Sequence, residues 1–467
     1  MTSRDGAINR AAAYLDTGGF EAELADLVAI PSESQTRQGL PHCQRYLNEA
    51  MIPAFQDMGF DCQVFDNPIA GSGPVLLATL HERDDLPTVL GYGHGDVIHG
   101  LADSWTKGAG PWQLARDGDR LYGRGTADNK GQHLINIRAL QAVLQERGTL
   151  GFNAKFLIET GEETGSQGLR QIITANINAF AADVFIASDG PRVNPDRPTL
   201  SLGCRGAVNF DLICDMRHGG HHSGNWGGAL IDPATVLAHA IATIVSPRGE
   251  ILVPEWRPDP IRPLVRKLLA DVVLEAGVDG PQVDAGWGEP GLSAAENVYA
   301  WNSFAVLAIL AGIPDSPVNA IAPKACAHCQ LRFIKGTDAD DILPALRRHL
   351  DAHGFAHVTI TEPDGDAGFT ASRTEPDNPW AEWAQTSVTK TTRVAPAVVP
   401  QMGGSICNEL FTDLLGLPTL WFPHSYAGCS QHAPDEHVLL PTCRSALRLM
   451  AGIYWDLGEP DTPYHRA

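Results

Sequence analysis

The sequence has 467 residues, of which 43% are hydrophobic and 19% are charged. This length and composition predict a large buried core that is divided between two domains. The net charge of −21 argues against a nucleic acid or an anionic membrane as a partner, because phosphate binding needs clustered Lys and Arg.

Two further features favour a cytoplasmic protein. No run approaches the roughly 20 apolar residues that a membrane span needs, and the first residues lack the apolar core of a signal peptide. The nine cysteines are an odd number scattered along the chain, which is typical of reduced thiols rather than of a disulfide framework.

The predicted elements of the first half alternate between helices and strands. Apolar residues at a spacing near 3.6 predict helices over residues 11–15, 20–30 and 43–58. Later apolar runs predict strands over 75–80, 88–92, 154–158 and 184–187, and helices over 133–145 and 166–173. This alternation is typical of an α/β domain with a mostly parallel sheet.

The pattern changes after Gly206. The expected elements are then strands over 207–214, 325–334 and 357–361, a helix after Pro233 and another over 339–349. Helix–strand alternation resumes at Pro379 and ends with a strand over 420–422 and a helix over 443–457. The simplest organisation is an α/β domain, residues 1–206 and 369–467, interrupted by an α+β domain, residues 207–368.

Histidines and carboxylates follow several of these apolar runs. Parallel strands present their carboxyl ends at one edge of a sheet, and ligands bind there in open α/β sheets. Imidazole and carboxylate are side chain types that suit zinc. The residues are His94 and Asp96 after the run 88–92, Asp128 in a Gly-rich turn, Glu162 and Glu163 after 154–158, Asp189 after 184–187, and His432 after 420–422.

The adjacent pair Glu162 and Glu163 suggests a division of roles. Neighbouring side chains near a strand end point in different directions, so one carboxylate can bind a metal while the other takes a proton from water. Ordinary alternatives exist for single residues: Asp128 could be a helix N-cap, His94 a turn residue, and the glutamates a solvated turn. The joint order of these residues along the chain favours a metal site.

Two other motifs in the sequence are rejected, and the motif of another hydrolase class is absent. Cys326-Ala327-His328-Cys329 looks like a metal or redox motif, but residues three apart on a strand face opposite sides, so we expect no function for it. Gly91-Tyr92-Gly93-His94-Gly95 begins like a dinucleotide-binding loop, yet Asp96 replaces its last glycine. The sequence has no Gly-x-Ser-x-Gly elbow of a serine hydrolase.

The chain resembles the co-catalytic zinc peptidases and amidohydrolases of metallopeptidase family 20. These include carnosine dipeptidase, acetylornithine deacetylase, succinyl-diaminopimelate desuccinylase and carboxypeptidase G. The resemblance covers nearly the whole chain and rests on four signatures in family order: His-x-Asp, Gly-Arg-Gly-x-x-Asp-x-Lys-Gly, Glu-Glu-x-Gly-Ser and His-x-Pro-x-Glu. It implies a catalytic domain with a mostly parallel sheet, interrupted by an inserted α+β lid and dimerisation domain.

The resemblance also implies two Zn²⁺ ions per subunit, at ligands that Mn²⁺ or Co²⁺ could also occupy. Asp128 would bridge the two ions. His94 and Asp189 would complete one site, and Glu163 and His432 the other. Asp96 would orient His94 from behind, and Glu162 would be the general base.

Further roles follow from the same resemblance. His222 aligns with a lid histidine that reaches the partner subunit's active site, so a homodimer is expected; a flexible surface turn is the alternative. Gly404 and Ser405 resemble a turn that contacts the substrate carboxylate. Arg332 and Asn319 align with substrate-contacting positions of the lid, although a buried salt bridge would also explain Arg332.

We therefore predict a hydrolase that cleaves the amide bond of a dipeptide or similarly small peptide. Asp189 stands where the deacylases of the family commonly have Glu, which favours the dipeptidase-like branch. An N-acyl-amino-acid deacylase is the alternative within the class, and a catalytically silent binding or scaffold protein is the alternative outside it. The Trp- and Pro-rich segment 254–297 does not align with the family and could shape the substrate pocket.

Overall fold

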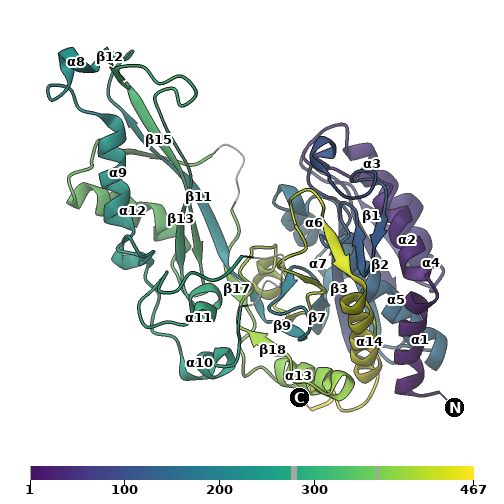
Figure 1. Ribbon diagram of the computed structural model, residues 1–467. Helices are drawn as coiled ribbons and strands as arrows, with labels where there is room; N and C mark the ends of the chain where they lie inside the picture. The colour runs from purple at the N-terminus through teal and green to yellow at the C-terminus, as the bar shows by residue number, and fades with distance from the viewer. Residues whose placement is uncertain (1, 275–280, 364–367, 467) are drawn as a thin grey trace.

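The computed structural model describes residues 2–274, 281–363 and 368–466. Within them, an eight-stranded sheet forms the centre of the larger part of the molecule (Figure 1). Its strand order is β1-β2-β6-β3-β7-β19-β9-β18. The strands are β1 (Asp61–Phe65), β2 (Val75–Leu80), β3 (Thr88–His94), β6 (Asn153–Glu159), β7 (Val184–Ala187), β9 (Thr199–Ser201), β18 (Ala397–Val399) and β19 (Thr419–Trp421).

The central sheet is mixed, and its middle strands are parallel. β3 pairs in parallel with β6 and β7, and β19 pairs in parallel with β7. β1 with β2, β2 with β6, and β19 with β9 are antiparallel pairs, and β18 runs parallel to β9. The α/β class is thus confirmed, and the predicted parallel arrangement holds where the ligand residues follow the strands.

Helices cover both faces of this sheet. Strand side chains alternate between the faces, so Val184 and Ile186 join one core while Phe185 and Ala187 join the other. The first face packs against α1 (Arg4–Asp16), α2 (Gly19–Val28), α5 (Lys130–Arg147), α13 (Pro379–Thr392) and α14 (Leu440–Leu457). The second packs against α6 (Leu169–Ala175) and α7 (Ile177–Phe180). The predicted helix over 43–58 is α3 (Leu40–Arg45), a π-helical turn and α4 (Ile52–Gln56).

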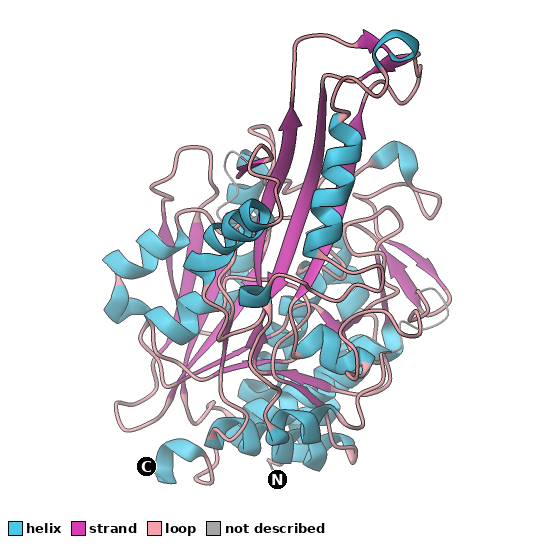
Figure 2. Ribbon diagram, turned by 90° about the vertical axis from the view of Figure 1, so that its left-hand side faces the viewer, coloured by secondary structure: helices cyan, strands magenta, loops and turns pink. Residues whose placement is uncertain are grey.

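The segment after Gly206 forms a second, antiparallel sheet in the order β13-β15-β11-β16. Its strands are β11 (Gly206–Asp215), β13 (Ser303–Ala311), β15 (Lys324–Phe333) and β16 (Thr359–Thr361). Helices α9 (Pro233–Ile244) and α12 (Ile342–Ala352) enclose a core with one face of this sheet. Figures 1 and 2 show the long strands rising away from the central sheet.

The chain enters and leaves the second sheet side by side. β10 (Gly203–Cys204) pairs with β17 (Ser372–Arg373), and Ala207 forms a bridge with Phe369. Residues 364–367 of the expected inserted domain lie outside the described residues, as do residues 275–280 of the unaligned segment 254–297. α10 (Pro263–Leu269) in that segment and α11 (Ala294–Tyr299) at its end share a small core with β18.

Smaller sheets bring distant segments together. β4 (Ala115–Asp117), β5 (Arg120–Tyr122) and β21 (His437–Leu439) form one of them, in which His437 pairs with Tyr122. This pairing sets the turn that follows Tyr122 beside the segment that precedes His437. β8 (Pro191–Arg192) pairs with β20 (Ser425–Tyr426). No helix in the described ranges combines the length and apolar character that crossing a membrane requires.

Candidate metal centre

His94 ends β3 and is fully buried. Its Nδ1 lies 3.1 Å from the backbone oxygen of Asp96 and 3.4 Å from the Asp96 carboxylate. Its Nε2 lies 2.9 Å from Asp128 Oδ1 and 3.7 Å from Asp189 Oδ2. One ring nitrogen is thus held by Asp96, while the other points at two carboxylates.

Asp128 lies between two histidines. Its Oδ1 faces His94, and its Oδ2 lies 3.0 Å from His432 Nε2. The Gln431 amide also donates to Oδ2, over 2.6 Å. The helix N-cap alternative for Asp128 is wrong, because Asn129 occupies the N-cap of α5 and makes no side chain capping bond.

The two glutamates lie in a short 3₁₀ turn, Glu162–Thr164, that follows β6. The backbone N–H groups of Glu162 and Glu163 donate to the two oxygens of Asp96, at 3.3 and 3.1 Å. Asp96 therefore ties this turn to the end of β3. Glu163 Oε2 lies 3.1 Å from His432 Nε2, while Glu162 lines the adjacent cavity.

Ligand atoms of His94, Asp128 and Glu163 all lie within 4.8 Å of one another. His432 and Asp189 contact members of this group at the distances given above, so the structure brings all five sequence-predicted ligands together. His432 is the most open of them, with 55% of its side chain exposed. It lies in a loop and adopts a positive φ of 61°, which is uncommon for a residue other than glycine.

Burial and crowding strongly affect the charges at this centre. Burial, reinforced by repulsion from Asp128, raises the pKa of Glu163 to about 7 and that of Asp189 to about 6. Burial likewise raises the pKa of Glu162 well above its usual value. Hydrogen bonds with Asp128 and Glu163 raise the pKa of His432 to about 11.

The donor set fits a divalent cation. Four carboxylates crowd around the floor of one cavity and repel each other, and a bound cation offsets that repulsion. Two imidazoles and several carboxylates form a donor set that suits zinc and related transition metals.

A buried glutamate that the sequence analysis leaves without a role supports Asp128. Glu436 Oε1 accepts from the backbone N–H groups of Ala127 and Asp128, at 2.9 and 3.0 Å. Its Oε2 accepts from Gly125 N–H at 3.0 Å and from Arg124 at 2.8 Å. Glu436 is the last residue of the His-x-Pro-x-Glu signature, and that position is the signal that could have identified it.

A cavity of about 840 Å³ opens beside this centre. The second sheet contributes Arg332 to its wall, and Arg332 Nη1 donates to Ser405 Oγ at 2.7 Å. Gly404 lines the same wall. Within the described part of the chain, Arg332 bonds to Ser405 and Gln330 rather than to a carboxylate, so the salt-bridge alternative is not what the structure has.

Several cavity residues were not identified from the sequence, and Asn209, Gln330 and Tyr299 are three of them. Asn209 and Gln330 extend from the second sheet, and Gln330 donates to Asn209 at 2.8 Å. Tyr299 reaches the cavity from the end of α11, two residues beyond the segment that did not align. A wall made by β11, β15 and α11 is a consequence of tertiary structure, which no local sequence pattern encodes.

His222 and Asn319 lie elsewhere. β12 (His221–His222) pairs with β14 (Ala320–Ile321), and Ser223 N–H donates to the Asn319 oxygen. These two short strands form a separate small sheet beyond the far end of the second sheet, with α8 (Ser223–Trp226) beside it (Figure 1). Neither residue lines the cavity of its own chain.

Comparison with known proteins identifies the family. Residues 90–456 match the model of peptidase family M20/M25/M40. A cysteinylglycine-S-conjugate dipeptidase of Corynebacterium striatum is 30% identical over 67% of this chain and 70% of that protein. A Beta-Ala-His dipeptidase of Mus musculus is 32% identical over half of each chain. The chain thus spans only about half the length of this second relative.

Solved structures share the fold. The dipeptidase Dug1p of Saccharomyces cerevisiae superimposes with a TM-score of 0.79 at 20% identity, over 99% of this chain and 100% of that one. The metallo-carboxypeptidase Sso-CP2 of Sulfolobus solfataricus gives 0.79 at 22% identity, over 94% and 99%. From the extent of the family match and from the relatives, the chain belongs to peptidase family M20/M25/M40 and is a metal-dependent hydrolase.

Proposed function

We propose that this hydrolase is a dipeptidase that works with two zinc ions. The observation that carries the proposal is the position of Asp128, whose two carboxylate oxygens face different histidines, His94 and His432. A carboxylate in this position is suited to bridge two cations. The relatives support the substrate class, because those named above are dipeptidases.

The remaining ligands divide between the two sides of Asp128. Asp189 lies near His94 and would complete one site, while Glu163 contacts His432 and would complete the other. Bound divalent cations supply Lewis acidity that holds and acidifies a water and polarises the scissile carbonyl. Asp96 would fix the His94 ring from behind, since it contacts Nδ1.

Glu162 is the proposed general base. It lines the cavity beside the ligands, and Asp96 holds its backbone in place through the Glu162 N–H. Its carboxylate would accept a proton from the attacking water and deliver it to the departing amine. Burial raises the pKa of this carboxyl well above its usual value and so increases its affinity for a proton.

Arg332, Gly404 and Ser405 are the proposed anchor for the free carboxylate of the substrate. Arg332 and Ser405 already contact each other on the cavity wall, and Gly404 leaves room beside them because no atom lies near the position of a Cβ. A guanidinium with an adjacent hydroxyl is a common recognition unit for a carboxylate. This anchor requires a substrate with a free C-terminal carboxylate.

The segment between residues 207 and 368 is the proposed lid and dimerisation domain. Its small β12–β14 sheet holds His222 and Asn319 away from the cavity of its own chain, so both residues would act in the partner subunit's site. The edge strand β13 supports an interface, because Val306, Leu307 and Ile309 are exposed apolar residues along it. In the partner subunit's site, His222 would stabilise the negative charge that develops on the carbonyl oxygen of the substrate.

A substrate panel tests the function. Protein reconstituted with Zn²⁺, Mn²⁺ or Co²⁺ is assayed with cysteinylglycine, β-alanylhistidine and other dipeptides, and with N-acetyl and N-succinyl amino acids. We expect kcat/KM for the best dipeptide to exceed that for any acylated amino acid by at least about 100-fold. Preference for acylated amino acids would make the chain a deacylase, and no hydrolysis of either class would favour the silent binding protein.

A further inference from the structure

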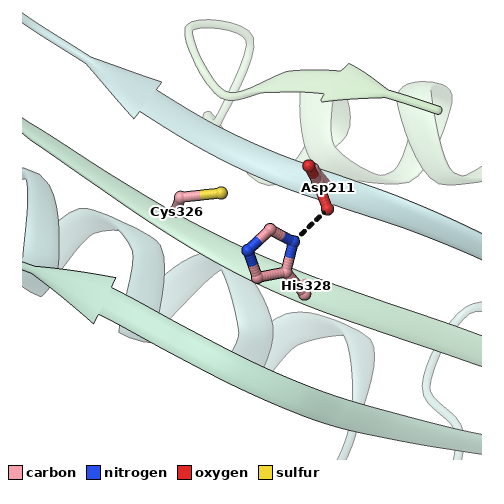
Figure 3. Close-up of side chains that lie close together, drawn as sticks. All are labelled: Asp211, Cys326 and His328. Atoms are coloured by element: carbon pink, nitrogen blue, oxygen red, sulfur yellow. Dashed lines mark hydrogen bonds and ion pairs between the residues drawn. The ribbon is translucent and has the colours of Figure 1, made fainter. Parts of the chain in front are cut away.

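The open face of the second sheet carries a group of side chains that the proposed peptidase chemistry does not use. Asp211 on β11 is directly opposite His328 on β15. Cys326 precedes His328 by two residues on β15 and so faces the same side. Figure 3 shows the Cys326 sulfur directed toward the His328–Asp211 pair.

The geometry of this group resembles that of the metal centre. His328 Nδ1 lies 2.6 Å from Asp211 Oδ1. One ligand atom from each of Asp211, Cys326 and His328 lies within 4.8 Å of the other two, as in the group of His94, Asp128 and Glu163. In the described part of the chain, these are the two groups with that property.

The ligand types of the two groups differ. The first contains imidazole and carboxylates, whereas this one adds the sulfur of Cys326. A thiolate, an imidazole and a carboxylate with one open position form a donor set for zinc-like ions, and Mg²⁺ or Ca²⁺ would not select it. We propose that Asp211, Cys326 and His328 bind one additional zinc-class ion per chain, separate from the proposed co-catalytic pair.

The surroundings permit binding. All three side chains are partly exposed, so an ion can enter and water can fill the fourth position. Tetrahedral zinc needs ligand atoms roughly 3.3–3.8 Å apart, and side chains with solvent on one side can rotate to reach that spacing. Most of the described cysteines are buried. Cys326 and Cys62 are the two that are partly exposed.

This site differs from the motif that the sequence suggested. Cys329 belongs to the buried core on the opposite face, as the strand alternation predicts, and it takes no part. The third ligand is Asp211, which lies 115 residues before Cys326 in the sequence and meets it only through the pairing of β11 with β15. Sequence spacing therefore cannot reveal the site.

A plain cross-strand ion pair is the competing explanation. An exposed His–Asp pair on a sheet contributes little stability and needs no metal. It also gives no role to the thiol beside it. The two explanations differ in one measurable property, which is whether a bound metal has a sulfur ligand.

Cobalt spectroscopy tests that property. Metal-free protein, kept reduced, is titrated with Co²⁺ while thiolate-to-cobalt charge-transfer absorption is followed in the near ultraviolet. The proposed co-catalytic ligands are nitrogen and oxygen atoms, so they contribute no such band. We expect the band in the wild type and in Cys62→Ser. In Cys326→Ser we expect the band to disappear and the number of bound Co²⁺ ions to fall by one per chain.

Further variants complete the test. His328→Ala and Asp211→Asn should weaken the cobalt affinity of this site by at least about 10-fold while the circular dichroism spectrum is unchanged. Absence of a thiolate band in the wild type, or an equal band in Cys326→Ser, would overturn the proposal. The readout is independent of peptidase activity, so a failure here leaves the proposed function standing, and the reverse also holds.

Discussion

Glu162 and Glu163 are neighbours in sequence with different surroundings. Both line the cavity, but Glu163 contacts His432 and belongs to the group of close ligand atoms, whereas Glu162 does not belong to that group. If Glu162 is the base and does not bind metal, replacing its carboxylate removes the base and leaves every metal ligand in place. Glu162→Gln should therefore lower kcat by about 10²–10⁴-fold while the metal content stays the same. Glu163→Gln, the matched control, should lose metal.

Steady-state kinetics and elemental analysis of the two variants make this comparison. Undiminished hydrolysis by a metal-loaded Glu162→Gln protein would contradict the assignment of the base. It would equally contradict the division of roles between the adjacent carboxylates.

Protons compete with metal at the same residues. In the metal-free protein, Glu163 and Asp189 have folded-state pKa values of about 7 and about 6, above their ordinary values. Between pH 5 and 7 the folded state therefore holds protons that the unfolded state has released, so the stability of metal-free protein should fall as the pH rises. The affinity for zinc should rise over the same interval.

Thermal unfolding of metal-free and zinc-loaded protein at pH 5, 6 and 7 measures both trends. The midpoint of the metal-free protein should drop with pH, and the stabilisation by zinc should grow. A metal-free midpoint that rises from pH 5 to 7 would show that the crowded carboxyls do not carry raised pKa values.

At the scale of elements, the Gly-rich turn before α5 depends on a residue more than 300 positions away. Glu436 accepts from three backbone N–H groups of that turn and from Arg124. Arg124 is itself buried, so an altered Glu436 leaves a buried charge without its partner. Glu436→Gln should destabilise the protein by roughly 3 kcal/mol and weaken zinc binding by about 10–100-fold.

Urea denaturation and competition with a zinc chelator measure these two effects. Glu459→Gln is a suitable control, because that glutamate pairs with Arg147 at the surface. If the zinc affinity of Glu436→Gln were unchanged, the turn would position Asp128 without the Glu436 carboxylate, and the prediction would be wrong.

Some strands could be predicted from the sequence and others could not. The strands that precede His94, Glu162 and Asp189 were predictable, because buried parallel strands appear as short apolar runs. Strand β13 was not predicted, although its continuous apolar run resembles those of the predicted strands; the exposure of that run at the edge of the second sheet is visible only in the structure. Sequence patterns also do not predict that the central sheet is mixed, since strand direction depends on pairing partners distant in the sequence.

For the whole molecule, the sequence identifies the residues of the candidate metal centre better than those that form the cavity wall. The family resemblance implied the ligand set His94, Asp128, Glu163, Asp189 and His432, and the fold brings these five residues together. The residues that shape the cavity, such as Tyr299 and Gln330, come from packing between separate parts of the chain. Glu436 is an intermediate case, visible in a signature but explained only by its hydrogen bonds.

The position of His222 leads to a prediction about assembly. If it acts in the partner subunit, Glu162→Gln and His222→Asn chains are each nearly inactive alone but complement each other when mixed. A heterodimer would contain one intact site, so a 1:1 mixture should recover about a quarter of wild-type activity. Sedimentation of the active enzyme as a monomer, or no recovery after subunit exchange, would contradict the shared site.

The central claim is that Asp128 bridges two cations held by residues from across the chain. The most direct measurement is a crystal structure of the zinc-loaded protein with anomalous diffraction at the zinc edge. We predict two strong peaks about 3.5–4 Å apart, one on the His94 side of Asp128 and one on the His432 side. A single peak at this centre, or peaks that His432 does not contact, would contradict the account.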